Sequence, residues 1–239
     1  MDISQSWLVK TKIAHRGLYN AQFPENSIGA FNNAVKRGFA MELDVRLLSD
    51  GKIAVFHDEG LSRMTGSDGY ICNFDSEKLK PLRLLKTDQR IPLLSEVLEE
   101  VDGKAPLLIE IKNPNKVGAL EQAVIKLLED YKGEFAVESF NPYTLEYFKH
   151  NAPHIARGQL SSYFRNVHLS KVKRYALKRL LFNKITHPDF IAYEFANLPN
   201  RWVTKSGLPV VAWTVRSQAD YDAVKDLCDN IIFEGFIPD

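Results

Sequence analysis

Short apolar runs alternate with amphipathic runs along the whole chain, and this alternation constrains the fold more than any other feature. Eight apolar runs predict strands, at residues 11–15, 40–46, 107–112, 134–139, 156–160, 190–194, 209–214 and 230–234. Seven amphipathic runs predict helices, at residues 27–38, 94–101, 117–131, 142–150, 169–183, 197–206 and 217–227. Strands that alternate with helices form parallel βαβ units. Eight such strands in 239 residues favour a (β/α)₈ barrel, and an open doubly wound sheet is the alternative.

Several predicted helices have, at one end or at both, a residue type that favours the start or the end of a helix. Serine and asparagine accept hydrogen bonds from the first free N–H groups, and glycine readily adopts the left-handed conformation that ends a helix. The expected first residues or caps are Asn26 or Ser27, Ser95, Asn141 before Pro142, and Ser217, and the expected ends are Gly38 and Gly207.

Composition narrows the class of protein. No Pro/Gly/Ser-rich linker interrupts the chain, so we expect a single domain over residues 1–239. A formal net charge of +1 argues against a nucleic-acid partner bound through the overall field. Cys72 and Cys228 lie far apart without metal-ligand spacing, and neither a signal-peptide core nor a membrane-spanning run is present. We therefore expect a reduced, cytoplasmic protein.

Two carboxylates lie near the end of the second predicted strand. Glu42 and Asp44 are two residues apart, so both side chains point to the same face of the strand. Like charges held this close repel each other unless a cation lies between them. Carboxylate oxygens bind hard divalent ions such as Ca²⁺ or Mg²⁺, so this pair predicts a metal site. A structural ion pair with Arg46 or Lys112 is the alternative interpretation.

Asp50-Gly51 follows this strand and predicts a two-residue hairpin turn, because the connection is too short for a parallel crossover. A turn centred there pairs Asp44 with His57, and directly opposed residues share a face. The third barrel strand carries a second pair at the same spacing, Glu110 and Lys112. Glu110 can complete a three-carboxylate metal site, and Lys112 can neutralise an anionic substrate.

The chain resembles the glycerophosphodiester phosphodiesterase family. The matching segments run in the family's order: AHRG (14–17), PENS (24–27), ELDVRLLSDGKIAVFHD (42–58), LSRMTG (61–66), IPLLSEVL (91–98), LIEIK (108–112), ESF (138–140) and GLPVVAWTV (207–215). The resemblance implies a TIM barrel with a small insertion after the second strand, at about residues 58–92. It also implies a metal-dependent phosphodiester hydrolase. The substrates would be glycerophosphodiesters, which are small molecules, and the products glycerol 3-phosphate and an alcohol.

The family's functional residues match particular positions of this chain. The resemblance implies that His15 and His57 act as acid and base and that Glu42, Asp44 and Glu110 hold a divalent metal ion. Arg16 and Lys112 match positions that bind phosphate, and Trp213 matches an aromatic near the substrate alcohol, although a role in the barrel core fits Trp213 equally well. Pro24 to Ser27 could also be no more than the start of a helix.

Two departures from the family pattern occur near the C-terminus. The last strand reads Ile232-Phe233-Glu234-Gly235-Phe236 where the family usually has Thr-Asp and then Pro, which bears on the choice of alcohol. The residues that follow are too few for a full eighth helix. We expect the N-terminal segment around Trp7, or another subunit, to cover that flank.

A basic stretch, residues 165–184, contains seven lysines and arginines and no acidic residue. One interpretation is an outer helix with a solvated basic face, and the other is peripheral docking on an anionic membrane. Docking would suit a lysophospholipase D-type enzyme that acts on membrane lipid, which is the alternative function. A protein that only binds its ligand is disfavoured, because every residue that hydrolysis requires is present.

Overall fold

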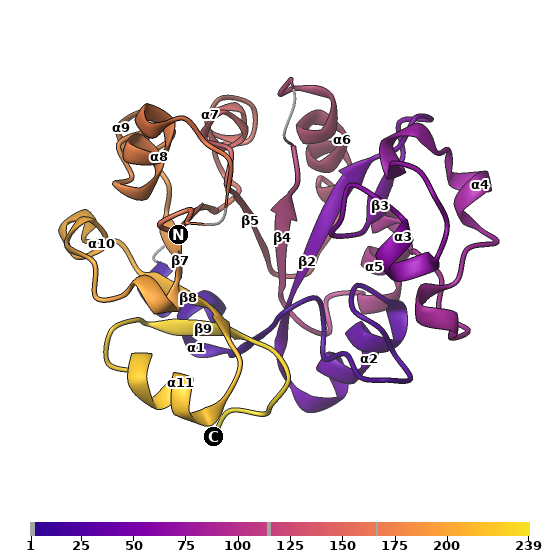
Figure 1. Ribbon diagram of the computed structural model, residues 1–239, viewed down its shortest axis with the longest axis horizontal. Coiled ribbons are helices and arrows are strands. Elements are labelled where there is room, and N and C mark those ends of the chain that lie inside the picture. Colours follow the sequence, from indigo (N-terminus) through magenta and orange to yellow (C-terminus); the bar gives the residue numbers. More distant parts are fainter. Residues whose placement is uncertain (1–2, 114–115, 166) are drawn as a thin grey trace. The chain divides into compact units, whose positions relative to one another are not determined.

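The computed structural model describes residues 3–113, 116–165 and 167–239, and its fold is the TIM (β/α)₈ barrel that the alternation predicts (Figure 1). The alternative of an open doubly wound sheet is therefore excluded. Contacts divide the chain into two compact units, residues 14–135 and residues 1–13 with 136–239. The expectation of a single domain stays a prediction, and the units are described in turn.

The unit of residues 14–135 is built on β2 (Ala40–Leu47) and β4 (Leu107–Ile111), which pair in parallel. Strand β1 (Ile13–Ala14) ends at its first residue, and the helices are α2 (Ile28–Arg37), α5 (Leu94–Val101) and α6 (Ala119–Leu128). The register places Asp44 directly opposite Glu110. The two pairs that the sequence predicts, Glu42 with Asp44 on β2 and Glu110 with Lys112 at the end of β4, therefore face the same side of the sheet.

The hairpin after β2 forms, but its predicted register is wrong by one residue. Strand β3 (Ile53–Val55) pairs antiparallel with β2, with Val45 opposite Val55. The turn closes over three residues, 49–51, with Gly51 at φ 80° as the left-handed residue that ends such loops. Asp44 is therefore opposite Phe56, whose N–H donates to the Asp44 carbonyl at 2.8 Å, and not opposite His57.

The insertion after the hairpin, residues 58–92, has short helices and a hydrophobic cluster of its own. Its elements are α3 (Ser62–Thr65), η2 (Ile71–Asn73), α4 (Ser76–Leu79) and η3 (Leu84–Lys86). Their apolar side chains pack together with residues of the hairpin, and the cluster consists of Leu48, Ala54, Phe56, Leu61, Met64, Ile71, Leu79, Leu84 and Ile91. This packing attaches α3 firmly beside the end of β3.

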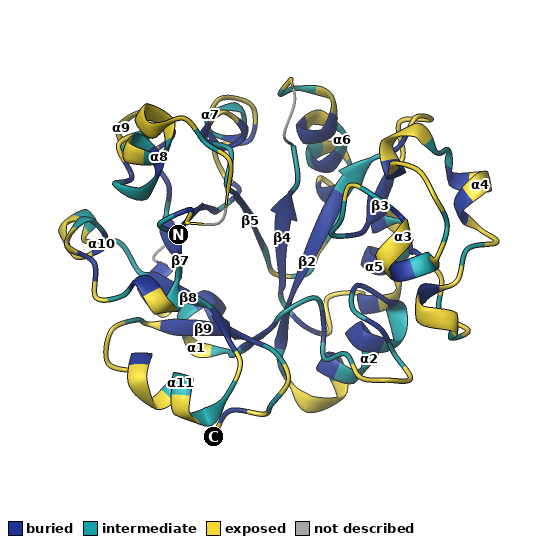
Figure 2. Cartoon of the chain, in the orientation of Figure 1, coloured by how far each residue is buried: buried dark blue, intermediate teal, exposed yellow. Residues whose placement is uncertain are grey.

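The second unit contains five parallel strands, each paired with the next: β5 (Phe135–Ser139), β6 (Arg157–Ser161), β7 (Phe190–Glu194), β8 (Val210–Val215) and β9 (Asn230–Phe233). Its elements outside the sheet are η1 (Ile3–Gln5), α1 (Trp7–Lys10), α7 (Pro142–Asn151), α8 (Lys171–Lys178), α9 (Asn183–Thr186), η4 (Phe195–Asn197), α10 (Arg201–Ser206) and α11 (Gln218–Val224). In both units the strands are buried and the helices expose their outer faces (Figure 2). No helix among the described residues is long and apolar enough to span a membrane.

Most helix boundaries lie where the capping residues predict them. Ser27, Asn141 and Ser217 each accept a backbone N–H at the start of a helix. Gly38 and Gly207 end α2 and α10 in the left-handed conformation. The prediction that Ser95 starts a helix as its first residue or N-cap is wrong, because α5 begins one residue earlier, at Leu94. The start of α5 is capped by the Glu96 carboxylate, which accepts the Leu93 N–H at 2.8 Å.

The predicted helix over residues 169–183 is also wrong in its extent. It ends at Lys178, and the chain continues through Leu180 at φ 56° into the separate α9. Leu180 is buried among Ile191, Tyr193 and Val203, so core packing stabilises a backbone conformation that leucine otherwise avoids.

The N-terminal segment packs in its own unit, against the last strand. Trp7 and Leu8 are buried, and the Asn230 side chain on β9 donates to the carbonyls of Leu8 and Thr11 at 2.8 Å each. The segment around Trp7 therefore packs against the beginning of β9. That this segment or another subunit covers the flank stays a prediction.

Candidate active site

A tight turn after β1 positions the first histidine and arginine. Arg16 has φ 56° and Gly17 has φ 78°, both left-handed. A side chain at Gly17 would also lie 2.9 Å from the Ala30 backbone, so only glycine fits where the turn meets α2. A non-glycine residue in this conformation is uncommon and persists where surrounding contacts maintain it. Here the Arg16 N–H donates to Glu42 Oε2 at 3.0 Å.

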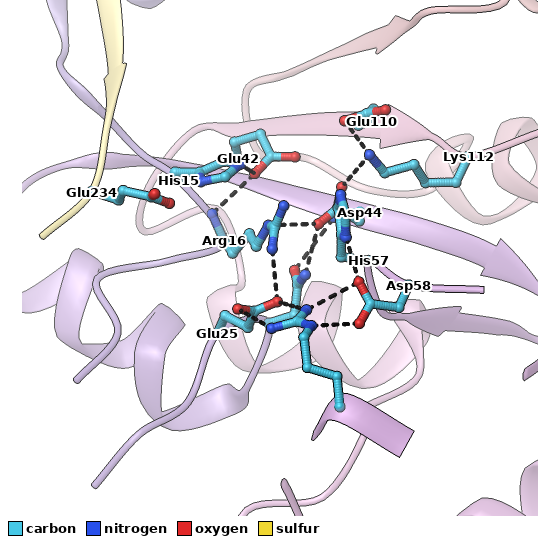
Figure 3. A network of polar contacts seen from close by, with 12 residues as sticks. His15, Arg16, Glu25, Glu42, Asp44, His57, Asp58, Glu110, Lys112 and Glu234 are labelled. Atoms are coloured by element: carbon cyan, nitrogen blue, oxygen red, sulfur yellow. Dashed lines mark hydrogen bonds and ion pairs between the residues drawn. The ribbon is translucent and has the colours of Figure 1, made fainter. Parts of the chain in front are cut away.

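The three predicted metal carboxylates come together. Glu42, Asp44 and Glu110 each offer an oxygen, and these oxygens lie within 4.8 Å of one another. All three residues are buried, with Asp44 completely so. Figure 3 shows that they gather on the side of the sheet where His15, Arg16 and His57 also lie. The cluster that the two-residue spacings predict on β2 and β4 is thus formed.

Two cations contact this cluster. Lys112 Nζ lies 3.0 Å from Asp44 Oδ1 and 2.7 Å from Glu110 Oε2, and Arg16 Nε lies 3.3 Å from Asp44 Oδ2. Burial alone would raise the pKa of Asp44, but the charges of Lys112 and Arg16 lower it well below 3.8. Burial dominates at Glu110, whose pKa is raised above 4.5. The alternative interpretation, in which these carboxylates form an ion pair with Lys112, is therefore correct for Asp44.

The segment Pro24 to Ser27 both starts a helix and contributes to the site. Glu25 Oε1 accepts from Arg16 Nη1 at 2.8 Å. Asn26, at φ 56°, donates from Nδ2 to Asp44 Oδ2 at 2.8 Å and accepts the Asp44 N–H at 3.3 Å. The sequence interpretation gave neither residue a role in the site and considered Asn26 only as a possible helix cap, although both belong to the PENS segment that carries the resemblance.

The second histidine is held by the residue that follows it. His57 Nδ1 lies 2.7 Å from Asp58 Oδ1. Asp58 in turn binds Arg63 of α3, whose Nε and Nη2 contact its two oxygens at 2.5 and 3.1 Å. The same guanidinium binds both oxygens of Glu25, at 2.6 and 3.1 Å. A continuous chain of polar contacts therefore runs from Arg16 through Glu25, Arg63 and Asp58 to His57 (Figure 3).

The electrostatics of the two histidines differ. Burial lowers the pKa of His57 below 6.5, and the charge of Lys112 acts in the same direction, while Asp44 and Asp58 oppose it. His15 Nε2 lies 3.9 Å from Glu42 Oε2. At Asp58, burial disfavours ionisation, but the contacts with Arg63 and His57 prevail and lower its pKa to about 2.

The donor set fits a hard divalent ion. Three buried carboxylates against the two cations that touch them leave one negative charge, which a divalent ion would convert to one positive charge. Oxygen-only ligands from carboxylates are the set that Ca²⁺ and Mg²⁺ prefer. A net positive charge at the site would attract the negatively charged phosphate of an anionic substrate.

Trp213, the remaining predicted site residue, lies on β8 in the second unit. It is half-buried, and its indole packs edge-to-face on Phe140 with ring centroids 5.4 Å apart. In the same unit Glu234, which follows β9, binds Arg216 Nε at 2.6 Å. The assignment of Trp213 to the substrate alcohol stays a prediction.

Comparison with known proteins agrees with this arrangement. Residues 15–239 match the model of the glycerophosphoryl diester phosphodiesterase family. A glycerophosphodiester phosphodiesterase of Caldanaerobacter subterraneus is 33% identical over 235 residues, which cover 92% of each chain. A lysophospholipase D of Rattus norvegicus is 38% identical over 135 residues, but the match covers only 51% of this chain and 42% of that protein.

A solved structure shares the fold. The phosphodiesterase of Oleispira antarctica, solved in complex with the product sn-glycerol-3-phosphate, superposes with a TM-score of 0.79. It is 24% identical and covers 94% of this chain and 92% of its own.

Proposed function

The chain belongs to the glycerophosphoryl diester phosphodiesterase family, and from this membership we propose how its residues perform the reaction. The protein is a phosphoric diester hydrolase that cleaves glycerophosphodiesters to glycerol 3-phosphate and an alcohol. The observation that carries the residue assignments is the close group of Glu42, Asp44 and Glu110 with a histidine on either side.

Arg16 and Lys112 supply fixed positive charge for the phosphate. Phosphodiester hydrolysis requires donors directed at the non-bridging oxygens, where negative charge increases in the transition state. Arg16 is oriented by Glu25 and Asp44, and Lys112 by Asp44 and Glu110, so neither cation must reorganise during the reaction. A Ca²⁺ or Mg²⁺ ion bound by Glu42, Asp44 and Glu110 would add Lewis-acid stabilisation of the same oxygens.

His57 is the base and His15 the acid in this proposal. Asp58 accepts the hydrogen on Nδ1 of His57, which leaves the lone pair on Nε2 to take the proton of the attacking oxygen. That oxygen belongs to water or to the substrate's own glycerol hydroxyl. In the second case the alcohol leaves behind a cyclic phosphate, and water then attacks the phosphorus and opens the ring to give glycerol 3-phosphate. As the new P–O bond forms and the bond to the alcohol breaks, His15 donates its proton to the leaving alkoxide. Glu42 Oε2 lies 3.9 Å from Nε2 of the His15 ring that donates this proton.

A substrate panel tests the function. Glycerophosphocholine, glycerophosphoglycerol and lysophosphatidylcholine are incubated with the protein, with and without EDTA, and glycerol 3-phosphate is measured. We expect turnover of the deacylated diesters that stops after verified removal of metal and returns with Ca²⁺ or Mg²⁺. Full activity in excess chelator would contradict the metal assignment.

Lysophospholipase D activity is the second candidate. The observation that favours it is the concentration of exposed apolar side chains, among them Val172 and Tyr175, in the basic stretch of the second unit. Release of choline from lysophosphatidylcholine at a rate above that from glycerophosphocholine would favour this candidate over the first. A higher rate with glycerophosphocholine than with lysophosphatidylcholine would show that the protein acts on deacylated diesters. A cytoplasmic location stays a prediction from composition.

A further inference from the structure

Exposed apolar side chains are concentrated in one short part of the second unit. Among the described residues, five of the ten exposed large hydrophobic side chains fall between positions 167 and 185: Val167, Val172, Tyr175, Leu181 and Ile185. They belong to α8, α9 and the segments beside them, in the basic stretch that runs from Arg165 to Lys184 without an acidic residue. Figure 2 shows extended exposed surface on α8 and α9. Residue 166 of this stretch lies outside the described residues.

The outer side of α8 combines apolar and basic side chains. Leu177 is buried and marks the inner side. At 3.6 residues per turn, Val172 and Tyr175 lie roughly 140–160° around the axis from Leu177, and Lys171 lies roughly 120° from it. Val172 is 80% exposed and Tyr175 is 49% exposed. A purely solvated helix face would place polar side chains at these positions.

Two more exposed apolar residues follow α8 in the chain, Leu181 just before α9 and Ile185 within it. Leu181 is 45% exposed and Ile185 is 48% exposed. Lys149 of α7 donates to the Ile185 carbonyl at 2.7 Å, which places a further cation at the backbone of α9. The Arg179 guanidinium stacks on the Tyr175 ring at 3.6 Å from its centroid, so an aromatic and a cation form one amphipathic unit.

We propose that the surface formed by Lys171, Val172, Tyr175, Leu181, Lys184 and Ile185, the basic–apolar surface, docks on anionic phospholipid bilayers. The exposed aliphatic and aromatic side chains enter the boundary between headgroups and acyl chains, and the lysines contact lipid phosphates. Docking of this kind places the enzyme where diesters derived from phospholipids are released.

Two other partners fit the surface less well. Nucleic acid would match the positive charge, but it offers no apolar layer for Val172, Leu181 and Ile185. A second copy of the chain would match the apolar side chains, but it would bring like charges together where no acidic residue lies in the stretch. Only an anionic membrane satisfies both properties.

Co-sedimentation with vesicles tests the proposal. One vesicle is pure phosphatidylcholine and the other contains phosphatidylglycerol, and each is used at low and at high salt. We expect binding to the anionic vesicle at low salt that weakens as salt rises, because exposed charges are screened over about 10 Å at 0.1 M. Lys171→Gln with Lys184→Gln should lower the partition coefficient about 25-fold, at about fivefold per charge. Val172→Ser should lower it severalfold at every salt concentration.

Matched variants separate a specific surface from general effects. Lys132→Gln with Lys205→Gln removes the same charge from exposed positions elsewhere, and Leu227→Ser removes an exposed apolar side chain outside the stretch. These variants should bind vesicles like the unchanged protein, and all of the variants should turn over soluble glycerophosphodiesters normally.

Three results would overturn the proposal. The first is absence of binding to anionic vesicles at low salt. The second is tighter binding to a DNA duplex than to vesicles with no effect of Val172→Ser, which assigns the surface to nucleic acid. The third is a dimer in sedimentation velocity that Val172→Ser dissociates, which assigns the surface to a second copy.

Discussion

Asp58 decides which nitrogen of His57 is available to the substrate. Its carboxylate accepts at Nδ1, and the pKa of about 2 keeps it ionised throughout the neutral range. The His57 ring is therefore held in one tautomer, with the lone pair on Nε2. The same logic applies wherever a carboxylate orients a catalytic imidazole.

The pH dependence of kcat/KM follows from the environment of His57. Burial lowers its pKa below 6.5, so the neutral base persists to lower pH and is lost only as pH falls through that lowered pKa. We therefore expect the acid limb of kcat/KM below pH 6.5. Asp58→Asn removes a contact that raises the pKa and should move this limb to still lower pH. Steady-state rates from pH 4 to 9 measure both. An acid limb that moves upward in Asp58→Asn would contradict the assignment.

Loss of the imidazole itself should be far more costly. His57→Gln and His15→Gln should each lower kcat by about 10²–10⁴, the usual contribution of a general acid or base. His154→Gln, at an exposed position of the second unit, is the control and should leave kcat unchanged. Circular dichroism verifies that each variant remains folded.

Arg63 acts on the reaction without reaching it directly. It donates two hydrogen bonds to Glu25, which orients Arg16, and two to Asp58, which orients His57. We expect Arg63→Gln to lower kcat about 10- to 100-fold, as the loss of an outer contact to a functional group typically does. Since a single ammonium cannot bind both carboxylates bidentately, Arg63→Lys should recover activity only in part.

The matched control for Arg63 lies in the same insertion. Arg83→Gln removes an exposed arginine whose guanidinium donates to the carbonyls of Lys80 and Leu82. It should leave kcat unchanged. A midpoint of urea unfolding that falls in Arg63→Gln while kcat is retained would show a purely structural role.

At the scale of elements, helix α2 connects stability to the site. Its first residue follows Ser27, whose Oγ accepts the Ala30 N–H at 3.2 Å, and Ser27 is fully buried. The two preceding residues are Glu25 and Asn26, which contact Arg16 and Asp44. The start of this helix therefore determines where both polar side chains lie.

Removal of this cap should cost measurable stability. We expect Ser27→Ala to lower the free energy of unfolding by about 0.5–2 kcal/mol, since a buried N–H loses its acceptor. Ser62→Ala is the control, because that serine is exposed at the start of α3 and makes no capping hydrogen bond. Urea denaturation compares the two. Equal losses in both variants would show that the cap contributes nothing specific.

At the scale of the whole molecule, metal binding and folding are linked. An ion that binds the native carboxylate cluster and not the unfolded chain stabilises the protein, by about 2.7 kcal/mol at a concentration 100 times the dissociation constant. We expect Ca²⁺ or Mg²⁺ to raise the melting temperature of EDTA-treated protein, and Glu42→Gln to remove most of that rise. Differential scanning calorimetry measures it without reference to activity.

Glu99→Gln is the matched control for this linkage, because Glu99 is an exposed residue of α5 outside the cluster. Its melting temperature should respond to the ion like that of the unchanged protein. An identical response in Glu42→Gln would contradict the metal assignment.

The sequence alone determined the order of strands and helices and most of the cluster. Hydrophobic periodicity depends only on local neighbours, so it predicts each strand to within one or two residues at most ends. The two-residue spacings of Glu42 with Asp44 and of Glu110 with Lys112 indicate a shared face for the same reason. The motifs of the family identified the histidines.

Only the tertiary structure decided how these parts meet. A three-residue turn, and not the predicted two-residue turn, shifted the hairpin register, and core packing of Leu180 divided the helix that begins at Lys171. The bridge from Arg63 to Glu25 spans 38 positions of the chain, and no local pattern predicts such a contact. Periodicity reports which face of an element is buried, whereas the position of a charged side chain depends on partners that folding alone brings near.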